Sequence, residues 1–245
     1  MRICAGNWKM NGTLETVHEL SKEMNRKKAE LAGTEIIVAP PYTLLMEARR
    51  YFDPVFKVGA QGICPYAVSG AYTGGVGAVQ VKDLHVESVI IGHSERGKYF
   101  KETEEEVHAQ LKMAMESELE IILCVGETEE ERSAGKTEEV VQKRLCLLKE
   151  VLTGITPQVI IAYEPVWAIG TGVVPAVEEI QPIVSLIHAE MGSSIKGVLY
   201  GGSVGKENAA SLMQIKNLSG FLVGNASLTS EFVEICGICN SSRSE

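Results

Sequence analysis

Three side chains that can donate, accept or stabilise a proton stand at the ends of short apolar runs in this sequence: Lys9, His93 and Glu164. A carboxylate can take a proton from a carbon next to a carbonyl group, and an imidazole can hydrogen-bond the carbonyl oxygen. An ammonium group can offset the negative charge of the enediolate that results. Together these residue types predict acid–base chemistry on a carbonyl compound.

Two glycine-rich turns follow apolar runs in the same way, Gly201-Gly202-Ser203 and Gly224-Asn225. Turns of this kind can direct several backbone N–H groups at one anion, so they predict a phosphate-binding site. A single charged residue or glycine at the end of a strand is more often an ordinary loop residue. The functional interpretation therefore depends on all of these positions meeting at one place.

The apolar runs themselves predict strands buried on both faces, because their hydrophobicity is continuous rather than alternating, as in a parallel sheet. Eight such runs occur, and they begin at Ile3, Glu35, Phe56, Ser88, Ile121, Val159, Gly197 and Gly220.

Between most of these runs lie polar segments with a helical period, for example Glu104 to Glu116 and Lys136 to Leu152. Eight strand–helix units in 245 residues give the length expected of a closed (β/α)8 barrel, the TIM barrel of α/β proteins. We find no linker or change of composition, so we expect residues 1–245 to form one domain. An open, doubly wound sheet is the alternative architecture.

The composition excludes several classes of function. A net charge of -9 and a pI near 5.2 argue against a general surface for nucleic acid or anionic membranes. No apolar run approaches the length of a membrane span, about 20 residues. The six cysteines are scattered, so we expect reduced thiols and a cytoplasmic location.

Six segments in order along the chain resemble the triosephosphate isomerases. They are N-W-K-M-N (7–11), I-I-G-H-S-E-R (90–96), C-V-G-E (124–127), A-Y-E-P-V-W-A-I-G-T-G (162–172), Y-G-G-S-V (200–204) and G-F-L-V-G-N-A-S-L (220–228). The resemblance implies the interconversion of dihydroxyacetone phosphate and D-glyceraldehyde 3-phosphate, a step of glycolysis and gluconeogenesis, with no cofactor and no metal.

The resemblance also assigns roles to individual residues. It implies that Glu164 is the base, that His93 is a neutral imidazole that polarises the carbonyl group, and that Lys9, helped by Asn7, stabilises the oxyanion. It implies that Gly170, Ser203, Gly224 and Asn225 hold the phosphate, mainly through their backbone N–H groups, and that Asn7 and Lys9 also contribute to binding the substrate.

A lid and a dimer loop are implied as well. The lid begins with Pro165, Val166, Trp167, Ala168, Ile169, Gly170, Thr171 and Gly172 and extends to Pro175; its closure would keep water from the enediolate. Thr73, in the loop S-G-A-Y-T-G (69–74), would insert beside Asn7 and Lys9 of a second copy, which implies a homodimer.

The sequence departs from the family pattern at four places. Asn225 stands where a second glycine is usual, and we expect its backbone donor to preserve phosphate binding because Asn tolerates positive φ. Gly75 replaces a frequent glutamate and Gly97 a frequent arginine, so a salt link from position 75 to Arg96 is unavailable. Pro175 has no N–H, so it cannot donate to the hydroxyl of Tyr200 when the lid closes.

Two other functions remain as alternatives from the sequence. The first is a barrel of the same ancestry that binds sugar phosphates without catalysis, which the presence of Lys9, His93 and Glu164 argues against. The second is another phosphate-binding barrel enzyme, such as an aldolase. A Schiff-base aldolase needs a lysine inside the barrel near the end of the sixth strand, where this sequence has Glu164.

Overall fold

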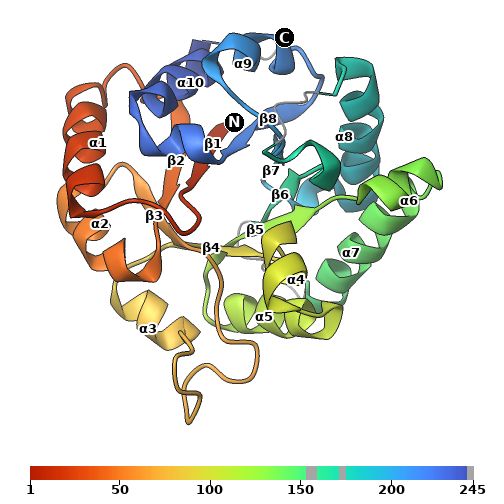
Figure 1. Ribbon diagram of the computed structural model, residues 1–245, viewed down its shortest axis with the longest axis horizontal. Coiled ribbons are helices and arrows are strands. Elements are labelled where there is room, and N and C mark those ends of the chain that lie inside the picture. The colour runs from red at the N-terminus through yellow and green to blue at the C-terminus, as the bar shows by residue number, and fades with distance from the viewer. Residues whose placement is uncertain (153–158, 171–174, 242–245) are drawn as a thin grey trace.

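The computed structural model describes residues 1–152, 159–170 and 175–241. Each strand pairs in parallel with the next one along the chain, and β8 pairs with β1, so that the sheet closes into a barrel (Figure 1). This confirms the (β/α)8 barrel and excludes the open sheet. The strands are β1 (Arg2–Asn7), β2 (Thr34–Ala39), β3 (Lys57–Ala60), β4 (Ser88–Ile91), β5 (Glu120–Val125), β6 (Val159–Tyr163), β7 (Gly197–Tyr200) and β8 (Leu218–Val223).

The helices lie around the outside of the barrel (Figure 1). They are α1 (Leu14–Arg26), α2 (Leu45–Tyr51), α3 (Ala78–Asp83), α4 (Ser94–Phe100), α5 (Glu104–Glu116), α6 (Glu129–Ser133), α7 (Thr137–Val151), α8 (Val177–Met191), α9 (Lys206–Leu212) and α10 (Ser230–Ser241). Short 3-10 turns span Tyr42–Leu44, Val166–Ala168, Gly192–Ser194 and Asn225–Leu228. In the part of the chain that the structure describes, none of these helices is long and apolar enough to cross a membrane.

Three of the helices begin at a threonine whose side chain accepts a hydrogen bond from the backbone at the third helical position: Thr13, Thr103 and Thr128. The third residue of each helix returns a side-chain bond to the backbone of the threonine, which satisfies two exposed donors at once. The acidic first turn of α5, Glu104 to Glu106, is also favoured by the helix dipole. Local sequence therefore determines where these helices start.

The core has two layers, because alternate residues of each strand point to opposite faces of the sheet. Ile3, Ala5, Ile90, Ile122 and Leu199 belong to the cluster that fills the inside of the barrel. The residues between them pack outward against the helices in a second and larger cluster. Burial on both faces explains the continuous hydrophobicity of the strand sequences.

At the amino-terminal ends of the strands, four charged side chains form a mostly buried network. Lys196 Nζ lies 2.8 Å from Glu120 Oε2 and 2.5 Å from Glu35 Oε2. Lys57 Nζ reaches the same two carboxylates at 2.9 and 3.1 Å. Because the four residues come from β2, β3, β5 and the residue before β7, the network links separate parts of the barrel.

The pKa values of the two carboxyl groups in this network are shifted in opposite directions. Burial alone would raise both pKa values, but the ammonium groups of Lys196 and Lys57 outweigh it at Glu35 and lower its pKa. At Glu120, burial together with the nearby Glu35 carboxylate prevails and raises the pKa. The network is therefore held together chiefly by the two lysines.

The substitution Lys196→Met is expected to lower the free energy of unfolding by about 3 kcal/mol, because it leaves two largely buried carboxylates with one half-buried partner. Unfolding in urea, followed by circular dichroism, measures the difference. The matched control is Lys206→Met, since the pair of Lys206 with Glu234 is about half exposed and spans 3.4 Å. The control should cost less than about 1 kcal/mol. Equal losses in the two variants would contradict a stabilising role for the buried network.

Candidate active site

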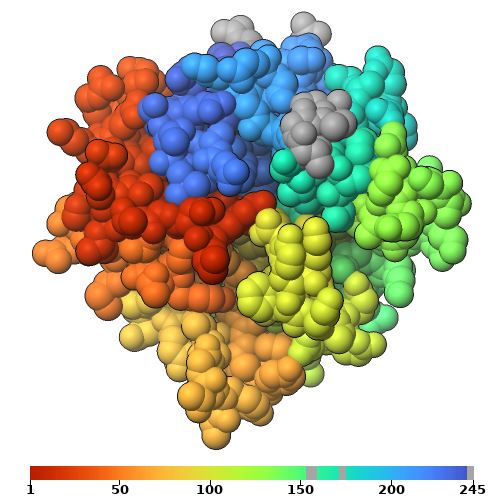
Figure 2. Space-filling model, viewed as in Figure 1, coloured from red at the N-terminus to blue at the C-terminus, as the bar shows by residue number. Residues whose placement is uncertain are grey.

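A cavity of about 290 Å³ opens at the carboxyl ends of the strands. In Figure 2 a hollow lies between the red segment after β1, the yellow helix α4 and the blue turn after β8. The cavity brings together the predicted acid–base residues and the predicted phosphate-binding residues, namely Asn7, Lys9, His93, Glu164, Gly170, Ser203, Gly224 and Asn225. The predicted residues therefore meet at one place, as the interpretation of the sequence required.

Glu164 follows the last residue of β6, and its backbone N–H donates to the carbonyl of Val125 at 2.7 Å. Two neighbouring glycines leave room for it. A Cβ at Gly126 would lie 1.8 Å from the Glu164 carbonyl oxygen, and a Cβ at Gly201 would lie 2.7 Å from its Cγ. We did not predict Gly126 as a site residue, and no local pattern identifies it, because its role depends on contact between neighbouring strands.

The carboxylate of Glu164 is almost completely buried, with 2% of the residue exposed. Its Oε1 lies 3.3 Å from His93 Nε2, and its Oε2 is buried without a hydrogen-bond partner among the described residues. Burial raises the pKa of Glu164, and the neighbouring His93 ring and Lys9 ammonium oppose that rise only in part. A carboxylate that is poorly solvated and incompletely paired is a more reactive proton acceptor than one in water.

His93 is the residue that precedes helix α4, and its ring is oriented by that helix. The backbone N–H of Glu95 donates to His93 Nδ1 at 3.2 Å. An Nδ1 atom that accepts a hydrogen bond carries no proton, so the single ring proton is on Nε2, facing the cavity. The neutral imidazole stays a prediction, and the hydrogen bond to Nδ1 is the geometry that supports it.

Lys9 is held in a left-handed backbone conformation, with φ of 53°. Two side chains stabilise this turn: Asn7 Oδ1 accepts from the Lys9 N–H at 3.0 Å, and Gln61 donates to the Lys9 carbonyl at 2.8 Å. Lys9 Nζ forms an ion pair with Glu95 at 2.7 Å. Our sequence interpretation missed Glu95, although its position two residues after His93 places it at the same rim.

The structure modifies our reasoning about the phosphate-binding turns. Asn225 begins a 3-10 turn and is not among the described residues with positive φ, so its tolerance of that conformation is not needed. Ser203 Oγ donates to the carbonyl of Ala168 at 2.9 Å, which connects the turn after β7 to the predicted lid. Gly170 is exposed with φ of +69°, a conformation that favours glycine.

The first part of the predicted lid is anchored to Glu127, at the end of β5. Trp167 Nε1 donates to Glu127 Oε1 at 2.8 Å, and the Val166 N–H donates to the Glu127 carbonyl at 3.0 Å. The guanidinium of Arg132 lies 3.8 Å from the centre of the Trp167 ring. Pro165 and Ala168 are buried, Ile169 borders the cavity, and the predicted lid residues Thr171 and Gly172 lie outside the described residues.

At the other end of the lid, Pro175 is buried. The hydroxyl of Tyr200 is also buried, and within the described parts of the chain it has no hydrogen-bond partner. That Pro175 cannot donate an N–H to Tyr200 follows from the proline itself, and the missing bond in the closed lid stays a prediction.

The departures at Gly75 and Gly97 leave Arg96 with other partners. Its Nε lies 3.1 Å from Glu102 Oε1, and its guanidinium lies 4.6 Å from the centre of the Phe100 ring. The predicted loss of a link to position 75 is thus compensated within the segment that contains Arg96 itself.

Thr73, the predicted dimer residue, is exposed on the loop between β3 and α3, which protrudes from the body of the protein (Figure 1). Tyr66 and Tyr72 stack within this loop, with ring centroids 5.6 Å apart, and the Tyr66 hydroxyl donates to Glu106. The loop therefore has an ordered conformation of its own.

Fold and site together define a (β/α)8-barrel enzyme that performs acid–base chemistry on a small anionic ligand. The chain belongs to the triosephosphate isomerase family, whose model matches residues 2–239. In the described ranges, no group of three or more His, Cys, Asp and Glu side chains is arranged to hold a metal ion.

Relatives of similar length support this membership. The chain is 39% identical over 239 residues to a triosephosphate isomerase of Aspergillus oryzae, which covers 94% of this chain and 95% of the relative. It is 41% identical over 236 residues to the one from Clostridium tetani, which covers 92% and 91%. A relative from Alkaliphilus oremlandii is 39% identical and covers 97% and 98%.

The substitution Glu164→Gln is expected to stabilise the protein at pH 7, by on the order of 1 kcal/mol in the free energy of unfolding. Because the pKa of Glu164 is raised in the folded state, its ionisation costs stability. That cost is absent below the pKa of the unfolded chain, about 4.3, and develops as the pH rises through the folded value. The gain should therefore vanish near pH 4.

Unfolding in urea at pH 7 and pH 4 measures this difference. The exposed Glu207 provides the control, because Glu207→Gln should change stability little at either pH. A Glu164→Gln variant that is less stable than the wild type at both pH values would contradict the expectation.

Proposed function

We propose that this protein interconverts dihydroxyacetone phosphate and D-glyceraldehyde 3-phosphate. Family membership supports the activity, and the observation that carries the residue assignment is the contact of Glu164 Oε1 with His93 Nε2 at 3.3 Å inside the cavity. A base and a hydrogen-bond donor at this distance can act on neighbouring carbon and oxygen atoms of one substrate.

In the proposed reaction, Glu164 removes a proton from the hydroxyl-bearing carbon next to the carbonyl group. The electrons of the broken C–H bond form the double bond of an enediolate, and His93 Nε2–H donates to the oxygen that becomes negative. His93 passes its Nε2 proton to this oxygen and takes up the proton of the neighbouring hydroxyl group, so that the negative charge moves to the other oxygen. Glu164 then returns a proton to the other carbon as the new carbonyl group forms, and this completes the exchange of aldehyde and ketone. No cofactor or metal takes part in this proposal.

The other cavity residues have supporting roles in the proposal. Lys9, held in place by Asn7 and Gln61, stabilises the negative oxygen through its ammonium group. Backbone N–H groups around Gly170, Ser203, Gly224 and Asn225 bind the phosphate, and this binding energy positions the reacting carbons. Because the protein is acidic overall, with a net charge of -9, its anionic substrate depends on these local donors.

We further propose a cytoplasmic homodimer. The protruding loop carries Tyr66, Val68 and Tyr72, three apolar side chains that are 61%, 37% and 45% exposed. Met10, next to Lys9, is 92% exposed. An exposed apolar surface of this kind favours association with a second copy, in which Thr73 would lie beside Asn7 and Lys9 of the partner.

The substitution Glu164→Asp is expected to lower kcat roughly 10²-fold or more, because shortening the side chain withdraws the carboxylate by about an ångström from the carbon. A coupled assay of isomerisation measures the rates. The control is Glu127→Asp, which shortens another acidic side chain near the end of a neighbouring strand. Glu127 does not line the 290 Å³ cavity. The control should lose less activity than Glu164→Asp. Unchanged kcat in the Glu164→Asp variant would remove Glu164 from the role of base.

Sedimentation equilibrium at micromolar concentration is expected to give twice the chain mass of 26.6 kDa. Thr73→Arg should shift the mass toward that of one chain, because it adds a charged and bulky group at the centre of the proposed interface. Ser133→Arg, at an exposed position on α6, serves as the control and should leave the mass unchanged. A wild-type protein that sediments as a monomer would contradict the proposal.

A further inference from the structure

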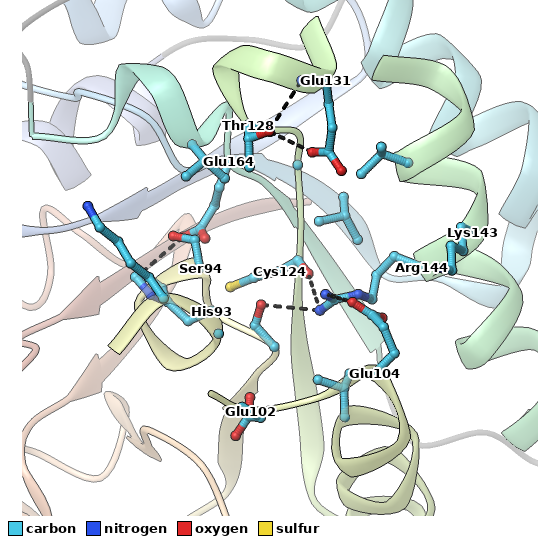
Figure 3. Close-up of a pocket in the computed structure, with 18 of the residues that line it drawn as sticks. His93, Ser94, Glu102, Glu104, Cys124, Thr128, Glu131, Lys143, Arg144 and Glu164 are labelled. Atoms are coloured by element: carbon cyan, nitrogen blue, oxygen red, sulfur yellow. Dashed lines mark hydrogen bonds and ion pairs between the residues drawn. The ribbon is translucent and has the colours of Figure 1, made fainter. Parts of the chain in front are cut away.

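Helix α4 supplies the hydrogen bond that orients His93, yet it is weakly packed against the barrel. All of its residues are half-buried or exposed. Beside it lies a second cavity, of about 630 Å³, between α4, α5, α6 and α7 (Figure 3). A Cβ placed at Gly97, on α4, would meet one atom of the described residues outside its own helix within 4 Å, the Glu102 carbonyl oxygen at 3.8 Å. The position of His93 therefore depends chiefly on the backbone that joins it to β4.

That backbone is a single residue, Gly92, which separates His93 from the last residue of β4. Gly92 has φ of +72°, a conformation that favours glycine. The pairing of β4 with β5 ends at Ile91 and Leu123, one residue before Gly92 and Cys124. The strand ladder therefore does not join Gly92 to the end of β5.

The guanidinium group of Arg144 makes this connection instead (Figure 3). Its Nη1 donates to the Gly92 carbonyl at 3.2 Å and, at the longer distance of 3.5 Å, to the Cys124 carbonyl. A Cβ at Gly92 would lie 2.3 Å from Nη1, so the guanidinium packs directly on the backbone of that residue. Its Nη2 lies 2.5 Å from Glu104 Oε1, at the start of α5. A planar guanidinium can donate to several acceptors in one fixed geometry, which the single ammonium group of a lysine cannot match.

Arg144 is itself held in place by the outer layer of the barrel. It belongs to α7, which is anchored by the buried residues Val141, Leu145, Leu148 and Val151. Its ion pair with Glu104 connects it to α5 as well. The guanidinium therefore fixes the backbone at Gly92 relative to two helices that carry none of the proposed acid–base residues.

The two carbonyl groups that Arg144 contacts stand next to the acid–base pair. Gly92 precedes His93, and Cys124 precedes Val125, whose carbonyl accepts the Glu164 N–H at 2.7 Å. A shift of one strand end relative to the other would change the distance of 3.3 Å between His93 Nε2 and Glu164 Oε1. A displacement of about an ångström between reacting groups can lower a rate roughly 10²-fold.

We propose that Arg144 is a positioning residue, which fixes the end of β4 against the end of β5 and so sets the distance between His93 and Glu164. Arg144 does not line the 290 Å³ cavity, so it acts through the backbone and not on the substrate. The inference rests on the proposed isomerisation, in which these two side chains act on one substrate.

The substitution Arg144→Met keeps the apolar stem of the side chain and removes its donors. In a coupled assay of isomerisation, kcat should fall at least about tenfold while KM changes less than about threefold, because the phosphate-binding turns are untouched. Arg144→Lys, which keeps the charge but lacks the planar fork, should also lose kcat, to a smaller extent.

The matched control is Lys143→Met, which removes an exposed charge from the same helix and from the lining of the same cavity. The control should retain kcat within about twofold of the wild type. Wild-type kcat in the Arg144 variants, or an equal loss in Arg144→Met and Lys143→Met, would overturn the proposal.

Chemical rescue separates positioning from general support of the fold. Arg144→Ala leaves a space beside the second cavity, from which a guanidinium ion can reach the two carbonyl groups. Guanidinium, at a concentration too low to unfold the protein, should raise kcat of Arg144→Ala at least about fivefold. Urea, which is planar and uncharged, should not. Rescue by both compounds, or by neither, would overturn the proposal.

The position of His93 can also be followed without reference to enzyme activity. In protein labelled with ¹⁵N-histidine, the ring signals of His93 are assigned by their loss in His93→Gln. They should shift in Arg144→Met and remain in place in Lys143→Met. A lower kcat with unchanged ring signals would show that Arg144 does not act through His93. A wild-type protein without isomerase activity would refute the proposed function instead, and the ring signals would still test whether Arg144 positions His93.

Discussion

The buried carboxylate of Glu164 imposes a requirement on much of the surrounding structure. A charged group removed from water is unfavourable, so it must be compensated by nearby charges and donors without being fully neutralised. The structure meets this requirement with the His93 ring at 3.3 Å and with the more distant Lys9 ammonium, while Oε2 has no hydrogen-bond partner among the residues that the structure describes. The barrel makes this arrangement possible because the ends of β1, β4 and β6 meet at one rim.

The parts of this arrangement that are local in sequence could be predicted. Apolar runs that fill both layers of the core identify the strands, and the polar residue after each run identifies what reaches the rim. The helix start at Thr103 could likewise be predicted from the acidic residues that follow it. The ion pair of Glu95 with Lys9 could not be predicted, because it depends on how close the barrel brings the residues that follow β1 to those that follow β4. The need for glycine at positions 126 and 201 could not be predicted either, because only the folded structure shows that a side chain there would collide with Glu164.

Substitutions relative to the family pattern have local consequences in this structure. Arg96 lacks a partner at position 75 and instead pairs with Glu102 and stacks on Phe100, so the charge remains satisfied. Gly97 has the opposite effect, because a Cβ there would meet only the Glu102 carbonyl oxygen, at 3.8 Å, and a cavity remains beside His93 and Glu164. Variation beside the site thus changes its immediate surroundings, while Glu164 Oε1 and His93 Nε2 lie 3.3 Å apart at its centre.

The pairing of β1 with β8 also has a consequence for synthesis on the ribosome. Residues 2–7 are made first, yet one edge of this strand has no partner until residues 218–223 have been made. A nascent chain therefore carries an apolar strand edge for most of its translation, and such edges are prone to pair with other chains. Pairing with β2 does not cover this edge, because β2 occupies the opposite edge of β1, so ring closure itself leaves the edge open until β8 is made.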